Sequence, residues 1–266
     1  MDQRAYDGFR YGSVDGQRIG LGFALKGDHL FSEAKKDEKK SFSFYEEAFQ
    51  GFMEIEPDSD FMFPYEPKYK GQVMKPVDMR SYVWYRIGKM HCYGLGTEQD
   101  YEKAFEWFLK SAQEGNKFAQ YSLANLYYYG NGVEKDLSQA FLWYRKSSEQ
   151  GQPYAPYAVA QMYDKGEYVS QSEETAQRYY KVALSGFLEL ESKGQADDNL
   201  YYKLGAMYKK GLGTEIDIPK AIEYFEKSAD KGNFHLPDQG TCGRPVPCDC
   251  TVSGIFWREP YCGGRV

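Results

Sequence analysis

The chain has 266 residues, of which 42% are hydrophobic and 27% are charged, so it is long enough to bury a core as one large domain or two ordinary ones. Its formal net charge of −6 offers no positive field for a phosphate backbone or an anionic membrane surface, which argues against nucleic-acid binding. No segment approaches the roughly 18 apolar residues of a membrane span, and charges and glycines fill the N-terminal positions that an export signal needs to be apolar. We therefore expect a cytoplasmic protein without membrane insertion.

One segment of the sequence recurs almost unchanged. The stretch YGLGTEQDYEKAFEWFLKSAQEGN (93–116) returns as KGLGTEIDIPKAIEYFEKSADKGN (210–233). Between them lie YGNGVEKDLSQAFLWYRKSSEQGQ (129–152) and the more divergent KGEYVSQSEETAQRYYKVALSG (165–186). The first three copies are 36 residues apart and the last follows after 45, so four units cover about residues 81–233. A period of this length predicts a repeat architecture.

Each unit is predicted to be a pair of helices. In the first helix, apolar or small residues at i, i+1, i+3 and i+4 form one face, as at Ile87, Gly88, Met90 and His91. A glycine then ends this helix, because a left-handed residue is favoured there. These glycines are Gly94, Gly130, Gly166 and Gly211.

The second helix of each unit is predicted to begin at a fixed point. A residue whose side chain can accept from free backbone N–H groups stands there in every copy. These residues are Asp100, Asp136, Ser172 and Asp217. An alanine follows, such as Ala104, which lets neighbouring helices approach closely, and an aromatic pair such as Trp107–Phe108 is predicted to fill the space between helix pairs.

The motifs resemble a known repeat family. The run Trp84-x2-Ile87-Gly88-x2-His91 is close to the W-x2-L-G-x2-Y pattern of tetratricopeptide helices, but the period is longer because a glycine-rich loop precedes KAFEWF, QAFLWY and KAIEYF. Together these features resemble Sel1-like repeats. The resemblance implies an all-α, right-handed α/α superhelical solenoid of stacked helix-turn-helix repeats. The four repeats would span 81–116, 117–152, 153–195 and 196–233.

Three segments lie outside the four repeats. Residues 1–19 are an N-terminal segment, and 20–80 are predicted to be a degenerate repeat with an inserted loop at 61–79, because SFYEEAFQGFMEIE echoes QRYYKVALSGFLELE. Residues 234–266 form a Cys/Pro-rich tail without helical period. Its four cysteines, Cys242, Cys248, Cys250 and Cys262, leave three alternatives open: a metal site, a disulfide-tied cap, or a tail unrelated to the array.

No catalytic motif is found, so no catalytic residue, metal or cofactor is assigned. His91 takes the place of an aromatic residue in its repeat and is expected to be a packed core side chain; Cys92 is expected to be a partly buried thiol. Some secreted, cysteine-rich relatives of this repeat family are associated with β-lactam binding or hydrolysis, which makes a hydrolase the alternative hypothesis. The repeats here contain only Cys92, which departs from the paired cysteines of those relatives.

The leading hypothesis is a non-enzymatic scaffold that binds a protein or peptide in a concave groove lined by the first helices. Helical-wheel positions away from the packed side of these helices are predicted to line the groove. They are Tyr85, Lys89, Cys92, Tyr121, Asn125, Tyr128, Tyr157, Gln161, Asp164, Tyr202 and Lys209. One position is tyrosine in all four repeats, and two interpretations remain open for it: packing between neighbouring helices, or a ladder of rings that contacts the partner.

Overall fold

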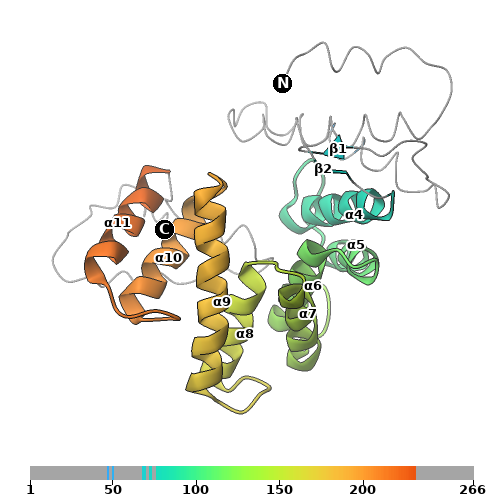
Figure 1. Ribbon diagram of the computed structural model, residues 1–266. Helices are drawn as coiled ribbons and strands as arrows, with labels where there is room; N and C mark the ends of the chain where they lie inside the picture. The colour runs from blue at the N-terminus through green and yellow to red at the C-terminus, as the bar shows by residue number, and fades with distance from the viewer. Residues whose placement is uncertain (1–46, 48–49, 51–67, 70–71, 74–75, 232–266) are drawn as a thin grey trace, which may run out of the picture.

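A computed structural model describes residues 47, 50, 68–69, 72–73 and 76–231. The N-terminal segment 1–19, most of the degenerate repeat at 20–80 and the tail 234–266 with its metal and disulfide alternatives lie outside these residues. Within 76–231, eight helices form one continuous array that runs from α4 to α11 (Figure 1). The predicted helical solenoid is therefore confirmed.

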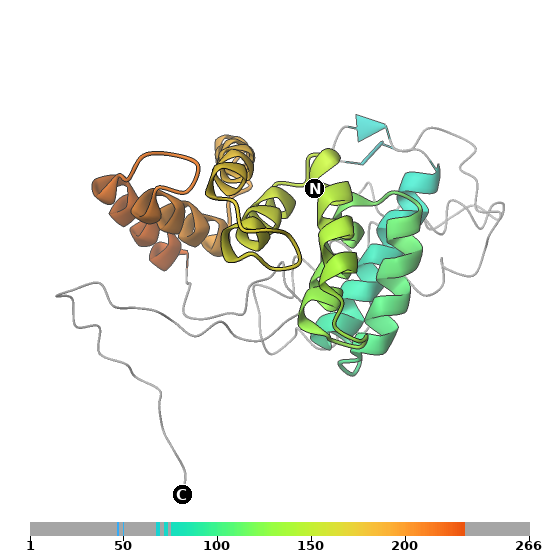
Figure 2. The ribbon, with the colours of Figure 1, turned by 90° about the horizontal axis from the view of Figure 1, so that it is seen from below.

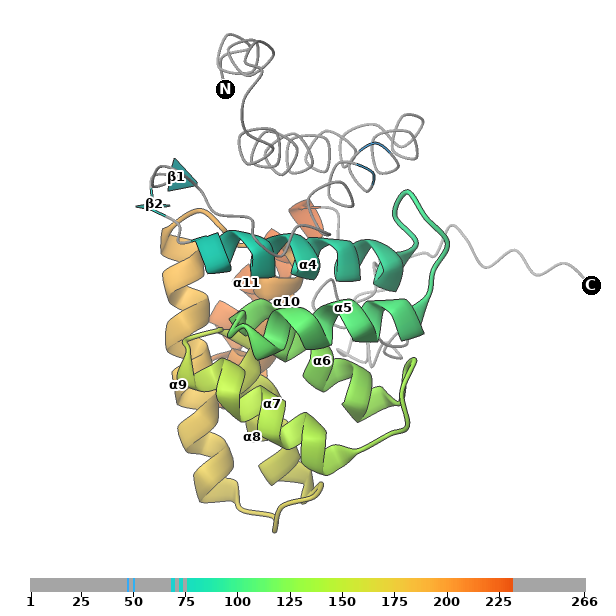
Figure 3. The ribbon, with the colours of Figure 1, turned by 90° about the vertical axis from the view of Figure 1, so that its right-hand side faces the viewer.

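The helices are arranged as four pairs, one for each predicted repeat. The pairs are α4 (Pro76–Tyr93) with α5 (Tyr101–Gln113), α6 (Lys117–Tyr129) with α7 (Leu137–Glu149), α8 (Tyr154–Lys165) with α9 (Glu173–Ser192), and α10 (Asp198–Lys210) with α11 (Ile218–Asp230). The contacts within each pair are more extensive than those between pairs. Seen from the side, the first two pairs stack in layers and α9 runs across their direction (Figure 3).

The segment before the first pair differs from its predicted form. Helix α4 begins at Pro76, inside the stretch 61–79 that was predicted to be a loop. The same stretch holds a short antiparallel hairpin of β1 (Lys68–Tyr69) and β2 (Gln72–Val73). The hairpin was missed because a strand of two residues carries no readable alternation of polar and apolar side chains.

The predicted helix ends are confirmed in the structure. The side chains of Asp100, Asp136, Ser172 and Asp217 each accept a hydrogen bond from a backbone N–H in the first turn of α5, α7, α9 and α11. At the other end, Gly130, Gly166 and Gly211 are left-handed caps of α6, α8 and α10. The loop between the two helices of a repeat is therefore fixed at both of its ends.

The closest contact within a pair joins an aromatic ring to a small residue. Phe108 on α5 packs so tightly against Gly88 on α4 that a Cβ atom added to Gly88 would lie 2.7 Å from the ring. Phe225 on α11 meets Gly205 on α10 in the same way. In the two middle pairs an alanine replaces the glycine and a tyrosine replaces the phenylalanine, and all four residues are buried in the core. They are Ala124 with Tyr144, and Ala160 with Tyr180.

A buried serine adds a polar contact to three of the four pairs. The Ser147 hydroxyl of α7 donates to the Lys117 carbonyl of α6 at 2.7 Å, and the Ser228 hydroxyl of α11 donates to the Asp198 carbonyl of α10 at 2.8 Å. Ser111 makes the equivalent bond to the Ser81 carbonyl. The accepting carbonyls lie at the start of α6 and of α10 and inside α4, and each bond gives the serine hydroxyl a partner where the opposite helix excludes water.

At two of the joints between pairs a loop glycine lies against the backbone of the preceding pair, whereas the third repeat has Tyr168, with φ of 64°, at this loop position. Gly132, in the loop between α6 and α7, has φ of 66°, and a Cβ atom there would overlap the backbone of Tyr101 at the start of α5. Gly213 is placed in the same way against the backbone of Tyr180 and Lys181 on α9. The glycine-rich loops of the repeat thus let successive pairs stack at backbone distance.

This close approach can be tested with two alanine substitutions. Gly132 and Gly151 both have positive φ, 66° and 72°, so alanine should cost about 1–2 kcal/mol at either position. A Cβ atom at Gly132 would overlap a neighbouring backbone, whereas nothing lies within 4 Å of a Cβ atom at Gly151. We expect Gly132→Ala to lower the free energy of unfolding by a further ~1–3 kcal/mol, measured by urea denaturation. Equal losses for the two variants would show that the loops do not limit the stacking.

Candidate functional site

A cavity of about 360 Å³ lies on the inner side of the array. Helices α4 and α6 line one side of it, and the second half of α9 lines the other; the start of α8 and the segment before α10 complete its edge. Viewed from below, α4 to α7 and α10 to α11 form two groups with α8 and α9 between them (Figure 2). The cavity therefore lies where the array changes direction.

The far wall of the cavity comes from the extended third repeat. Helix α9 has 20 residues, whereas α5, α7 and α11 have 13 each. Its additional turns carry Glu189 and Leu190, and Lys193 follows directly; all three line the cavity. The nine additional residues of this repeat thus build a surface that a regular repeat would lack.

The opposite wall is mainly aromatic. Tyr85 of α4 and Phe118 of α6 lie with their ring centroids 5.8 Å apart, and Tyr154 at the start of α8 contacts Tyr121 at 6.1 Å. Phe118 keeps 42% of its surface exposed although it is a large apolar side chain. Burial of the Tyr85 phenol raises its pKa to about 12, so this ring stays neutral near pH 7.

Lysines border this aromatic wall. The Lys89 Nζ atom lies 5.9 Å from the Tyr85 ring and 5.7 Å from the Tyr93 ring, and the Lys117 Nζ atom lies 5.5 Å from the Phe118 ring. On the far wall, Lys193 pairs with Glu189 at 2.5 Å, and this contact together with the charge of Lys117 lowers the pKa of the Glu189 carboxyl. The aromatic side of the cavity is therefore the more positive one.

Three of the predicted groove residues meet at this cavity: Tyr85, Lys89 and Tyr121. Most of the others lie elsewhere along the array. These are Tyr128, Tyr157, Gln161, Asp164, Tyr202 and Lys209. The sequence analysis did not identify Phe118, Tyr154 or the α9 wall, although the additional residues of the third repeat were a signal that this part of the groove would differ.

Two predicted groove residues are buried instead of facing the groove. The Asn125 side chain accepts a hydrogen bond from the Tyr144 hydroxyl at 2.5 Å, inside its own helix pair. Cys92 is fully buried in the core of the first two pairs and is disulfide-bonded, so it is not the partly buried thiol that we expected. The helical wheel assigned both to the open side because it uses positions on the first helix alone and leaves out the side chains that cover them.

The tyrosine repeated in every unit packs against its own second helix. The ring centroids of Tyr85 and Phe108 lie 6.0 Å apart, those of Tyr121 and Tyr144 lie 5.7 Å apart, and the later repeats have the same contact. These later pairs are Tyr157 with Tyr180 at 5.4 Å and Tyr202 with Phe225 at 5.6 Å. The contacts favour the packing interpretation of this position.

Two other predicted residues also make structural contacts. The Tyr128 hydroxyl donates to the Glu167 carboxylate at 2.6 Å, which joins α6 to the loop of the next repeat, and burial raises the pKa of this phenol. His91 is buried as predicted, and its carbonyl accepts from the Asp100 backbone N–H at 2.9 Å. Burial and the charge of Lys103 lower the pKa of the His91 imidazole, so it is neutral near pH 7.

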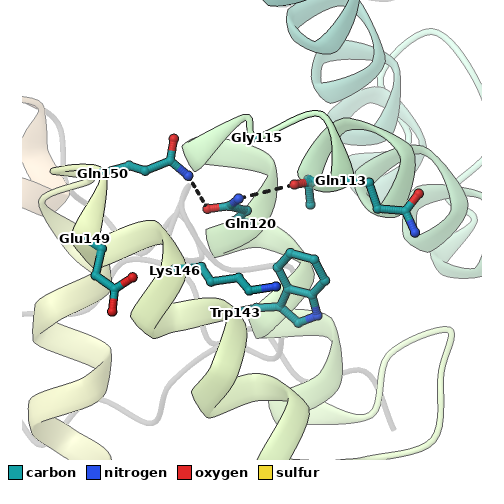
Figure 4. A pocket seen from close by; sticks show the side chains of 8 residues that line it. Gln113, Gly115, Gln120, Trp143, Lys146, Glu149 and Gln150 are labelled. Carbon is teal, nitrogen blue, oxygen red and sulfur yellow. Dashed lines mark hydrogen bonds between the residues drawn. The ribbon is translucent and has the colours of Figure 1, made fainter.

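A larger but shallower hollow, of about 460 Å³, lies at the C-terminal ends of α5 and α7 (Figure 4). The Gln120 amide nitrogen donates to the Ala112 carbonyl at 3.2 Å, and its oxygen accepts from the Gln150 amide at 2.7 Å. Beside them, the Lys146 Nζ atom lies 4.3 Å from the centre of the Trp143 ring. Since these side chains are engaged with one another across two repeats, this hollow belongs to the joint between repeats and is a weaker candidate for a binding site.

Searches of the described residues for other kinds of site gave negative results. Among residues 76–231 and the short segments before them, no group of three or more His, Cys, Asp or Glu side chains is placed to hold a metal ion. None of the helices in this part of the chain is both long and apolar enough to cross a membrane.

Comparison with known proteins places the chain in a family. The model of the Sel1 repeat family matches residues 20–51, 85–116, 117–152, 153–185 and 200–233. A Sel1 repeat protein from Oxalobacter formigenes has a similar crystal structure, with 27% identity and a TM-score of 0.51 over 79% of this chain and 70% of that one.

A second crystal structure shares the fold at lower identity. It is that of a protective antigen present in uropathogenic Escherichia coli strains, which displays an SLR fold; the identity is 22% and the TM-score 0.50. The match covers 80% of this chain but only 39% of the antigen. Because the family model matches more than half of the sequence, the chain belongs to the Sel1 repeat family.

Proposed function

We propose that this chain is a non-enzymatic scaffold that binds a protein or peptide partner in the groove lined by its first helices. Sel1 repeats generally mediate interactions between proteins, which supports the class of function. The observation that carries the proposal is the cavity between the aromatic wall of α4 and α6 and the additional turns of α9. At about 360 Å³ it falls at the small end of the range of ligand pockets, a size that suits one or two side chains of a partner.

The lining of the cavity indicates what it would accept. The Phe118 and Tyr154 rings offer apolar surface for a large apolar side chain, and Lys89 and Lys117 beside them favour a neighbouring carboxylate. The far wall carries Glu189 as well as Lys193, whereas the aromatic wall carries Lys89 and Lys117, so we assign the acidic group of the partner to the α4 and α6 side. The expected partner segment therefore carries an aromatic or aliphatic anchor next to Asp or Glu.

The repeated tyrosines enter this proposal mainly as supports. The Tyr121 ring lies 6.1 Å from the Tyr154 ring, and the Tyr85 ring lies 5.8 Å from the Phe118 ring. These two tyrosines therefore support the aromatic wall of the cavity. The hydrolase alternative gains no specific support from the described part of the chain, in which His91 is buried and takes part in the structural contact with Asp100.

A peptide selection on the purified full chain tests the groove. Peptides enriched from a displayed random library should lose at least about tenfold in affinity when Phe118 is replaced, because Phe118→Asp removes apolar surface and repels a carboxylate. Leu142→Asp is the matched control, since Leu142 on α7 is also 42% exposed and lies outside the cavity. Failure to enrich any peptide, or equal affinity for the two variants, would contradict the proposal.

The roles of the tyrosines can be separated by their effect on stability. Tyr121 is 6% exposed and Tyr202 is 47% exposed, although they occupy equivalent positions. We expect Tyr121→Ala to lower the free energy of unfolding by about 3–5 kcal/mol, as for other buried aromatics, and Tyr202→Ala to cost much less. Chemical denaturation of the two variants measures this difference. If Tyr121→Ala left stability unchanged but abolished peptide binding, the repeated tyrosine would be a contact residue after all.

A further inference from the structure

The last helix of the described array has an uncovered apolar stripe. Ile218, Ile222, Phe225 and Ala229 follow one another at intervals of four, three and four residues, which places them along one side of α11. Ile218 is 49% and Ile222 is 50% exposed, and Ala229 is also exposed. Together with the exposed Tyr202 of α10, whose ring packs on Phe225, the stripe forms what we call the terminal face.

The same positions are covered in the earlier repeats. Phe105 on α5, the counterpart of Ile222, makes an edge-on ring contact with Tyr127 on α6 at 5.4 Å. Phe141 on α7 has the same position and contacts Tyr163 on α8 at 5.8 Å. In the third repeat the counterpart is Gln177, whose side chain accepts from the Gly213 backbone N–H of the next loop at 2.7 Å. In each earlier repeat, therefore, this position contacts the repeat that follows.

The other residues of the terminal face follow the same rule. Ala112, the counterpart of Ala229, is buried, and its carbonyl accepts from the Gln120 side chain of α6. Tyr85 and Tyr121, the counterparts of Tyr202, contact Phe118 and Tyr154 of the following repeat. The terminal face is thus a continuation of the interface that the chain already forms between its own repeats.

We infer that the terminal face docks an amphipathic helix of another polypeptide that carries the side-chain pattern of this chain's first helices. That pattern is a small residue at i, aliphatic residues at i+4 and i+7, and an aromatic residue at i+8. In α6 these are Ala119, Leu123, Leu126 and Tyr127, and in α8 they are Ala155, Val159, Met162 and Tyr163. This surface is separate from the groove, so the inference does not depend on the proposed function.

The sequence that follows α11 does not supply this helix. In the register of α6, the four pattern positions would be Leu236, Gly240, Gly243 and Arg244, with Pro237 between the first two. Two glycines, a charged residue and a proline replace the apolar side chains that the face requires. The segment directly after α11 therefore does not carry the pattern, and we assign it to another polypeptide.

A second copy of the same face is a poor match on grounds of charge. Glu226 and Asp230 are exposed beside the stripe, so two terminal faces placed against each other would bring acidic side chains together. A helix with a basic edge would instead complement them. We therefore expect the partner helix to carry the side-chain pattern of the first helices, with Lys or Arg along one side.

A peptide made from the chain's own α6 tests this inference directly. A labelled peptide of residues 116–130, with two lysines added at its C-terminal end, would be titrated with the full chain and followed by fluorescence anisotropy. We expect saturable binding that weakens at least tenfold for Ile222→Lys, because the lysine places a charge in the centre of the stripe. Val182→Lys is the matched control, since Val182 is an exposed aliphatic residue on α9 and should leave the affinity unchanged.

Further measurements decide between the possible occupants. A peptide with Leu123→Asp and Leu126→Asp should not bind, and Phe118→Asp in the protein should not alter binding of the parent peptide, which distinguishes the terminal face from the groove. The inference is overturned if the full chain shows no saturable binding, including the case in which residues 232–266 already cover the face. It is equally overturned if all variants bind alike, or if sedimentation shows self-association that Ile222→Lys abolishes, which would assign the face to a second copy.

Discussion

The array depends on one steric constraint: an aromatic ring on the second helix of a pair needs a small residue opposite it on the first. Where the small residue is Gly88 or Gly205, the ring is phenylalanine; where it is Ala124 or Ala160, the ring is tyrosine. The contact sets how closely the two helices approach, and that approach brings the Ser147 and Ser228 hydroxyls within reach of backbone carbonyls. Every repeat preserves packing at this distance, together with a capping residue at the start of the second helix, whereas many other positions vary between repeats.

Differences between the repeats produce the cavity and the terminal face. The third repeat lengthens α9, and its additional turns face the aromatic wall of α4 and α6 across the cavity. At the end of the array, α11 keeps the apolar stripe that earlier repeats use for stacking. The two candidate surfaces therefore have different origins: the cavity arises from an insertion, whereas the terminal face arises because a repeated interface continues past the last described pair.

Local features of the fold could be predicted from the sequence, because each has a short-range cause. Asp136 begins a helix through its own side chain, and Gly130 ends one through its own left-handed backbone. The candidate site was harder to predict, since the exposure of a side chain depends on how other helices pack around it. Asn125 lies on the open side of the α6 helical wheel but is buried and bonded to Tyr144 of α7, while Phe118 looks like a core residue and yet lies on the cavity wall. The position of α9 could not be predicted, because the sequence shows how many residues the third repeat adds but not where in space the longer helix runs.

The repeated residues build the scaffold, and we propose that the cavity between α4, α6 and α9 receives the partner. The most direct measurement is amide hydrogen exchange of the full chain, followed by mass spectrometry, with and without a peptide enriched on it. We expect added protection in α4, in the first half of α6 and in the second half of α9, with no change on α7. Protection confined to α5 and α7, or spread evenly over the array, would contradict it.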